Sequence, residues 1–388
     1  MSESPPPVPE QPTAARTAPE PGGQRVDDGR GRIFPCEECG ADLEFHIPTQ
    51  GLKCPFCGHE KRIEPAEGAT IAEQDFRAML ARLEELRKAG TEPELSTEQS
   101  EVHCESCGAN VVFLGTLTSL NCPYCGSPIQ LENVHAAGQR IPVDAVLTFQ
   151  VPKEKAQANL TAWIQSLWFA PNEFRKKGIE GRLNGVYLPF WTYDALTATR
   201  YTGQRGEHYT VTVGMGKDRR TERRTRWYPA AGEFQRFFDD LVVLAAKGEH
   251  RGLAQKIDPW PLRETQPFKQ EFLAGFFSRT YDVPLDDGFI EAKGRIEEAI
   301  EADVRSRIGG DVQRVDTLDI HYGALSFKHI LLPTWLLAYR FHGEVYQVMI
   351  NAATGEVQGE RPYSWVKIAS AVLLGIIAVA VVVGLTSS

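Results

Sequence analysis

The chain has 388 residues, of which 42% are hydrophobic, and it carries a formal net charge of −9 at pH 7. This length suits two or three compact units, each large enough to bury a core. Binding to DNA or RNA draws most of its affinity from cations placed on phosphates, and an acidic chain offers few of them. Composition therefore disfavours nucleic-acid binding as the main function.

The first 31 residues are rich in proline and mixed charge and contain almost no large apolar side chain. Such a segment cannot bury enough apolar surface to offset the entropy lost on ordering. We predict a disordered, proline-rich tail over residues 1–31.

All eight cysteines fall into two copies of one pattern, 68 positions apart. In each copy, fourteen residues separate the second cysteine from the third. Each CxxC pair brings two thiolates to one ion, and two pairs complete a closed tetrahedral shell. We predict two structural zinc ribbons, at 32–65 and 101–135, which bind two zinc ions. A closed shell has no open position for a catalytic water, and this spacing is typical of metal sites rather than disulfides. The predicted ligands are Cys36, Cys39, Cys54, Cys57, Cys104, Cys107, Cys122 and Cys125.

Between the ribbons, residues 70–90 place Phe76, Leu80 and Leu83 at helical spacing, and Gly90 provides a stop. We predict a helical spacer that packs its apolar stripe on a neighbouring domain. We expect the ribbons to project from the body on this spacer.

The body, over about 140–363, has the pattern of a duplicated α+β unit, with unit 1 at 140–260 and unit 2 at 261–363. Helical stripes are expected at 153–170, with Trp168 on the stripe, at 268–276, and at 296–308 before Gly309-Gly310. A Leu-Pro-x-Trp phrase follows in each unit, ending at Trp191 and Trp335, 144 residues apart. We predict a helix followed by a curled antiparallel sheet, present twice.

Eighteen uncharged residues run from Ile368 to Leu385. A helix of this length covers roughly 27 Å at about 1.5 Å per residue, close to the thickness of a bilayer core. Trp365 and Lys367 suit the membrane interface. We predict a transmembrane helix at 366–385. The predicted fold class is therefore α+β with two small four-cysteine ribbons and one C-terminal span.

The orientation follows from charge and cysteine content. Arg361 and Lys367 before the span indicate that the N-terminal bulk faces the cytoplasm, and eight thiols suit a reducing compartment.

Catalytic motifs are absent from the sequence. It has no GxxxxGK[ST] phosphate loop, no GxSxG elbow and no HExxH pair, so we expect no enzyme. An enzyme would instead need a pocket in the body that converges on polar groups such as Asp194, His208 or Tyr193.

The segment 217–226 holds six cations against two acids. It is either a solvated hairpin or a contact for anionic lipid or an acidic partner.

The charge of the ribbons disfavours nucleic-acid binding and leaves two roles, protein-docking modules or metal staples that stabilise small domains. The first ribbon sums to −2 between Arg32 and Pro65, and the second to −3 between Glu101 and His135, before the thiolates are counted. In the second copy, apolar residues from Val111 to Leu120, Leu117 among them, lie between the knuckles. They form either a docking face for a partner or a contact with the body.

The ordered combination of these features resembles bacterial membrane proteins of the YdjG type, which have two N-terminal, TFIIB-type zinc ribbons and a C-terminal anchor. The resemblance covers about residues 31–388. It rests on the ribbons, on GVYLPFWTYDA at 185–195, on FKHILLPTW at 327–335 and on NAATGEVQGERP at 351–362 before the span.

This resemblance implies a role in membrane stress, as an anchor for phage-shock-protein-A-like and SPFH-like proteins, and it implies no catalytic or cofactor-binding residue. We predict a single-pass, tail-anchored adaptor at the bacterial cytoplasmic (inner) membrane that contacts lipid and a protein partner. The alternative is a nucleic-acid-associated zinc-ribbon factor tethered to the membrane.

Overall fold

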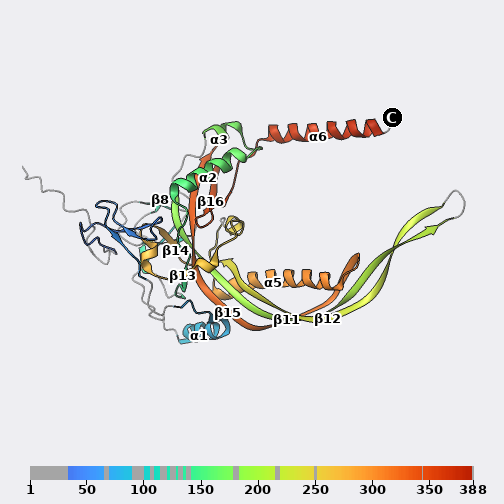
Figure 1. Cartoon of the computed structure of the whole chain (residues 1–388), viewed down its shortest axis with the longest axis horizontal. Helices are drawn as coiled ribbons and strands as arrows, with labels where there is room; N and C mark the ends of the chain where they lie inside the picture. Colours follow the sequence, from blue (N-terminus) through green and yellow to red (C-terminus); the bar gives the residue numbers. More distant parts are fainter. Residues whose placement is uncertain are drawn as a thin grey trace, which may run out of the picture.

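A long curved β-arm and the C-terminal helix α6 (Trp365–Thr386) extend from the body in the same direction (Figure 1). The protein, seen in a computed structural model, mixes helices and sheet. The described residues are 34–64, 70–89, 100–104, 109–113, 120–122, 128–129, 134–136, 141–177, 183–214, 219–248, 251–342 and 344–386. The predicted tail at 1–31 lies outside them.

Two strands of 30 residues each, β11 (Asn184–Val213) and β15 (Val312–Phe341), form the centre of a twelve-stranded sheet. They pair antiparallel along most of their length, and Leu188 lies opposite Leu332. These leucines belong to the two Leu-Pro-x-Trp phrases, so the repeated phrases pair with each other. Both predicted units therefore contribute to one sheet.

Further strands extend this sheet on both sides of the central pair. β12 (Arg220–Leu244) pairs with β11, and β16 (Glu344–Asn351) pairs with β15 and with β17 (Val357–Gly359). The shorter members are β4 (Gln74–Asp75), β5 (Ser100–His103), β6 (Asn110–Phe113), β9 (Val134–Ala136), β10 (Ala145–Val146), β13 (Gln266–Pro267) and β14 (Phe277–Arg279).

The helices of the body are α2 (Lys153–Ser166), α3 (Asn172–Lys177), α4 (Arg251–Ala254) and α5 (Leu285–Ile308), with short 3-10 turns at η3 (Leu262–Glu264) and η4 (Gln270–Leu273). The helix predicted at 296–308 is confirmed as the second half of α5, which ends before two glycines at φ 66° and 78°. The helix predicted at 268–276 is wrong. Gly275 has a φ of 82°, and the segment is the single turn η4 followed by β14.

Two indole hydrogen bonds tie the central strands to the helices. Trp191 in β11 donates its indole N–H to the carbonyl of Val283 at 3.0 Å, just before α5. Trp335 in β15 donates to the carbonyl of Val151 at 2.9 Å, just before α2. Each half of the body thus holds the start of the other half's helix.

The alanines that follow β12 and β16 make a second matching set of contacts. Ala245 donates its backbone N–H to the Pro189 carbonyl at 2.9 Å, and Ala352 donates to the Pro333 carbonyl at 3.0 Å. The carbonyls of the same two alanines accept the backbone N–H groups of Val283 and Val151. Short strands also match, because β14 runs parallel to β11 as β10 runs parallel to β15.

The arm consists of the C-terminal part of β11, the strand β12 and the N-terminal part of β15. The helix α5 covers one face of the arm (Figure 1). Ile296, Ile300 and Val304 on α5 are fully buried in a cluster that includes Tyr193 and Phe238 of the arm strands. This cluster also takes up Phe76, the first residue of α1 (Phe76–Ala89). The predicted packing of the spacer helix on a neighbouring domain is confirmed.

Candidate metal centre

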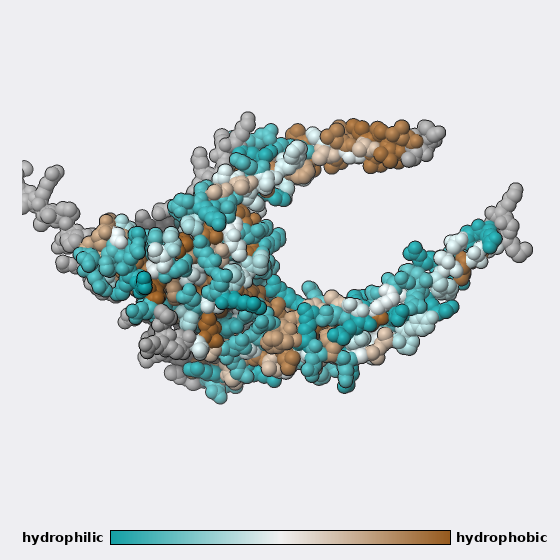
Figure 2. Space-filling model, in the orientation of Figure 1, coloured by the Kyte–Doolittle hydropathy of each residue, from teal (hydrophilic) through white to brown (hydrophobic). Residues whose placement is uncertain are grey.

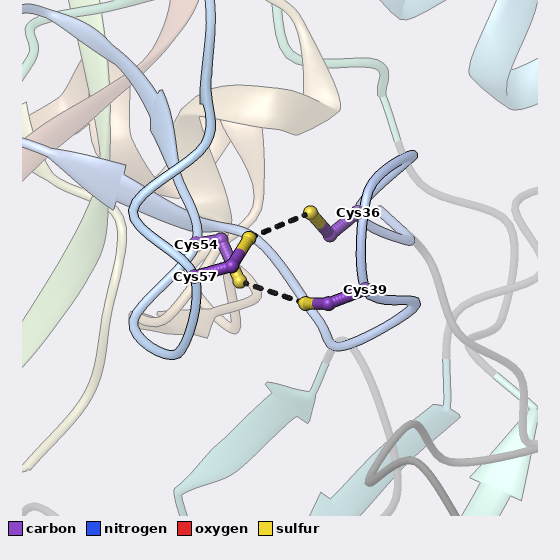
Figure 3. A group of neighbouring side chains, drawn as sticks. All are labelled: Cys36, Cys39, Cys54 and Cys57. Atoms are coloured by element: carbon purple, nitrogen blue, oxygen red, sulfur yellow. Dashed lines mark hydrogen bonds between the residues drawn. The ribbon is translucent and has the colours of Figure 1, made fainter.

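Four cysteines of the first ribbon meet at one point. The sulfur atoms of Cys36, Cys39, Cys54 and Cys57 all lie within 4.8 Å of one another (Figure 3). The Cys36 and Cys57 sulfurs are 3.5 Å apart, as are those of Cys39 and Cys54. Thiols on four separate positions gather this closely when they can share one metal ion.

The two halves of this cluster are turns with the same hydrogen bonds. Cys36 donates its backbone N–H to the Ala41 carbonyl at 2.7 Å, and Cys54 donates to His59 at 2.8 Å. Gly40 and Gly58 close each turn at φ 75° and 79°, and nothing lies within 4 Å of a Cβ built on Gly58. The backbone conformation, and not a lack of space, therefore requires glycine there.

Backbone donors favour the thiolate form of Cys54. The backbone N–H of Cys57 hydrogen-bonds to the Cys54 sulfur and lowers the pKa of this thiol to about 6, against the opposing effect of burial. A thiolate, and not a thiol, binds metal. Because the donor set is four sulfurs with no carboxylate or imidazole, it fits a closed tetrahedral zinc site.

The first ribbon is packed on the body and does not project from it as the sequence suggested. Its small sheet, β1 (Glu44–His46), β2 (Gly51–Lys53) and β3 (Glu60–Lys61), presents Phe45 to the body. The Phe45 ring lies 6.0 Å from that of Phe272, and its backbone N–H donates to the Ala274 carbonyl at 3.0 Å. Gln50 also donates to the Phe149 carbonyl at 2.9 Å.

The second ribbon is described in part. Cys104 and Cys122 are buried, like Cys36 and Cys54, whereas Cys107, Cys125 and the side chains from Val111 to Leu120 lie outside the described residues. Cys104 donates its backbone N–H to the Ala109 carbonyl at 2.9 Å, five residues on, as Cys36 does to Ala41. The strands β5 and β6 join the main sheet through β14, and β7 (Leu120–Asn121) pairs with β8 (Pro128–Ile129).

Within the described part of the chain, α6 is the helix that is long and apolar enough to cross a membrane. Its span from Trp365 to Val383 has a mean hydropathy of 2.7, and none of it is buried against the body. Figure 2 shows it as a continuous hydrophobic surface on an otherwise mostly polar exterior. This is compatible with a single-pass membrane protein.

The residues considered for an enzyme site do not converge. Tyr193 donates its hydroxyl to the Leu285 carbonyl at 2.7 Å beneath α5, and His208 is exposed on the arm. Asp194 is buried beside Lys328 at a bulge of β11. Burial raises the pKa of Asp194 to about 6, although the backbone N–H of Asp240 donates to its carboxylate at 2.6 Å.

Sequence analysis missed the ion cluster around Lys328. The Lys328 ammonium is 2.8 Å from the carboxylate of Asp240, 3.5 Å from that of Glu73 and 3.9 Å from that of Asp194. The available signal was a lysine inside the mostly apolar stretch 327–335. Glu73 precedes α1, so this cluster joins the spacer helix to the body.

The basic segment at 217–226 lies at the far end of the arm. Lys217 and Asp218 are outside the described residues, and the arginines of this segment are exposed, Arg219 just before β12 and the others on it. Glu222 pairs with Arg220 at 3.0 Å and with Arg224 at 3.3 Å. Both interpretations of this segment, a solvated hairpin and a contact surface, stay predictions.

The chain is similar to "Uncharacterized protein YdjG" of Bacillus subtilis (strain 168). The two are 24% identical over 338 residues, which cover 87% of this chain and 92% of the relative. No protein-family model matches the chain, and no solved structure matches it. This similarity over most of both chains, with the cysteine cluster and the apolar C-terminal helix, supports the resemblance to YdjG-type proteins.

Proposed function

We propose that this protein is a tail-anchored zinc-ribbon adaptor of the bacterial cytoplasmic membrane. In this proposal α6 spans the bilayer, the ribbons and the body face the cytoplasm, and the ribbons recruit a protein partner. The resemblance to YdjG-type proteins suggests that this partner is phage-shock-protein-A-like or SPFH-like and that the role belongs to membrane stress.

One observation carries the proposal: a closed four-cysteine centre is packed on the same body that ends in an exposed apolar helix. Four thiolates leave a metal no open position for catalysis, so the ribbon is suited to holding a surface in shape. Phe56, between Cys54 and Cys57, is 78% exposed. An aromatic side chain presented on a rigid turn is a typical anchor for a protein partner.

We extend the zinc assignment to the second ribbon. Support comes from the two buried cysteines, Cys104 and Cys122, and from the turn bond from Cys104 to Ala109 that repeats the one in the first ribbon. Cys107 and Cys125 complete this second set by sequence. The proposed total is two zinc ions per chain.

We also infer that the body arose by duplication. The supporting contacts are the matching pairs made by Trp191 and Trp335, by Ala245 and Ala352, and by the parallel short strands. The units would then be 140–260 and 261–363, each completed by contacts from the other.

The test is recruitment by the full-length tagged protein in bacterial membranes. Phe56→Asp should abolish co-purification of the partner while zinc content and membrane attachment stay unchanged. Phe237→Asp is the control, because Phe237 is also an exposed phenylalanine, at 58%, but lies on the arm. Truncation after Tyr363 should release the body and the partner together into the soluble fraction.

Two results would contradict the adaptor proposal. One is equal partner recovery with the Phe56→Asp and wild-type proteins when the ribbons of both retain zinc. The other is a salt-dependent enrichment of DNA or RNA in place of a protein, which would favour the tethered nucleic-acid factor.

A further inference from the structure

Two distant parts of the chain that carry exposed aromatic side chains meet at the start of α6. Tyr363 and Trp365, at the junction with the helix, are 53% and 80% exposed. Trp168 and Phe169, in the loop between α2 and α3, are 72% and 41% exposed. We call Trp168, Phe169, Tyr363 and Trp365 the aromatic collar.

Hydrogen bonds join the two parts of the collar. The backbone N–H of Ser364 donates to the Phe169 carbonyl at 2.8 Å. The Lys367 ammonium donates to the carbonyls of Trp168 at 3.1 Å and Ala170 at 2.8 Å. The first turn of α6 is therefore attached to a loop almost 200 residues earlier in the chain.

The packing of the loop forces its aromatic side chains outward. α2 ends at Ser166, and the loop continues with Leu167, which is buried, and ends with Ala170, which is also buried. With these two residues turned into the body, Trp168 and Phe169 face outward. Trp168 does not lie on the buried stripe predicted from sequence, because the helix ends before it.

We propose that the Trp168–Phe169 loop is a second membrane-interface contact, which seats the body on the lipid headgroups around α6. This inference rests on the proposed span. Tryptophan is enriched where apolar chains meet headgroups, because its ring is apolar and its indole N–H reaches the polar layer. Phenylalanine can bury its ring at the boundary between headgroups and acyl chains. In the sequence the basic run Arg175-Lys176-Lys177 follows the loop, and such a composition suits anionic lipid.

The arm limits how the body sits on the bilayer. It extends in the same direction as α6 (Figure 1), and it carries exposed charges such as Arg200 and Glu233. Charged strands with unpaired edges cannot enter hydrocarbon. The helix must therefore leave the body at a steeper angle to the arm when it crosses a bilayer. The chain turns at 361–364, which forms no helix or strand, and this change of angle breaks the bonds from Ser364 and Lys367 to the loop. The loop stays in place because Leu167 and Ala170 are anchored in the body.

The test uses the full-length protein in vesicles of phosphatidylethanolamine and phosphatidylglycerol. A photoreactive benzophenone amino acid replaces one residue at a time, at positions 168, 169, 237 and 376, and mass spectrometry measures lipid adducts after illumination. Position 376 lies within α6 and reports the span. Position 237 is an exposed phenylalanine site on the arm and gives the background.

We expect lipid adducts at 168 and 169 several-fold above those at 237, together with adducts at 376. Adducts at 376 without any excess at 168 and 169 would overturn the collar contact and leave the span intact. Crosslinks from 168 or 169 to protein instead of lipid would also overturn it. Absence of lipid adducts at 376 would refute the span itself, and the inference built on it would fall as well.

Discussion

The two halves of the body share their junction and differ in what extends from it. Each half places a tryptophan beneath the start of the other half's helix and an alanine beside the other half's valine. The first half then has a helix of 14 residues, α2, that leads to the exposed Trp168 loop. The second half has a helix of 24 residues, α5, that covers the arm.

This difference shows which contacts define the fold and which can vary. The junction buries its tryptophans and satisfies their indole N–H groups, which accounts for a tryptophan at this place in both halves. The extensions meet solvent or other parts of the chain, and they differ in length.

The largest expected effect is removal of the junction tryptophans. Trp191→Ala and Trp335→Ala should each lower the free energy of unfolding by about 3–5 kcal/mol, because a large buried side chain is lost. Chemical denaturation of the full chain in detergent micelles, followed by circular dichroism, measures this. If only one of the two substitutions is costly, the halves are not equivalent at the junction.

A smaller effect should separate the two helix starts. The backbone N–H of Gly288 in α5 donates to the Pro284 carbonyl, as that of Ala156 in α2 donates to the Pro152 carbonyl. At this position α2 accommodates the methyl group of Ala156, whereas α5 has no room for one. A Cβ on Gly288 would lie 2.5 Å from the Tyr193 hydroxyl. Gly288→Ala should cost about 1–3 kcal/mol through overpacking.

Gly294→Ala is the control for this substitution, since Gly294 lies in the same helix and nothing is within 4 Å of its Cβ position. It should stabilise the helix by about 0.5–1 kcal/mol. A neutral Gly288→Ala variant would mean that α5 is free to move away from the sheet.

The pH dependence of stability should come from the first half. Asp194 has no acidic counterpart, because Ala338 occupies the matching place 144 residues on. Its folded pKa of about 6 exceeds the ordinary aspartate value of about 3.9. Between these values the folded state retains a proton that the unfolded state has released, so stability falls as pH rises.

Asp194→Asn should therefore flatten the decline in unfolding temperature between pH 4 and pH 6. Asp316→Asn, at an exposed site on the arm, should leave the slope unchanged. An unaltered slope in Asp194→Asn would show that Asp194 is ionised throughout this range in the folded protein.

The smallest expected effect on folding is at the collar. Trp168→Ser should change the free energy of unfolding by less than about 0.5 kcal/mol, since the side chain is exposed. The same denaturation assay checks this, alongside Trp191→Ala. A loss comparable to that of Trp191→Ala would mean that Trp168 packs within the protein.

Features set by local spacing were predictable from sequence. The cysteine pairs, the stripe of α1, the Gly309-Gly310 end of α5 and the apolar run of α6 are each fixed within about twenty residues. The four-cysteine cluster of the first ribbon required only the CxxC spacing and one short hairpin. The repeated Leu-Pro-x-Trp phrase also pointed to the centre of the sheet.

Features set by distant pairing were not predictable. The arm depends on β11 meeting β15 more than 100 residues later, and the Lys328 cluster on β4 joining the edge of β15. The failed helix at 268–276 shows how Gly275 outweighs helical spacing of aromatic residues. Trp168 matched the stripe of α2, but the helix ended two residues too early to bury it.

The claim on which this account depends is that both ribbons bind zinc through their cysteines. Native mass spectrometry of the full-length protein in detergent tests it directly. We expect two zinc ions per chain, and loss of one ion in each of Cys54→Ser and Cys122→Ser, because each ribbon forms its own closed shell. Bound iron, a disulfide within either ribbon, or loss of both ions from one substitution would contradict it.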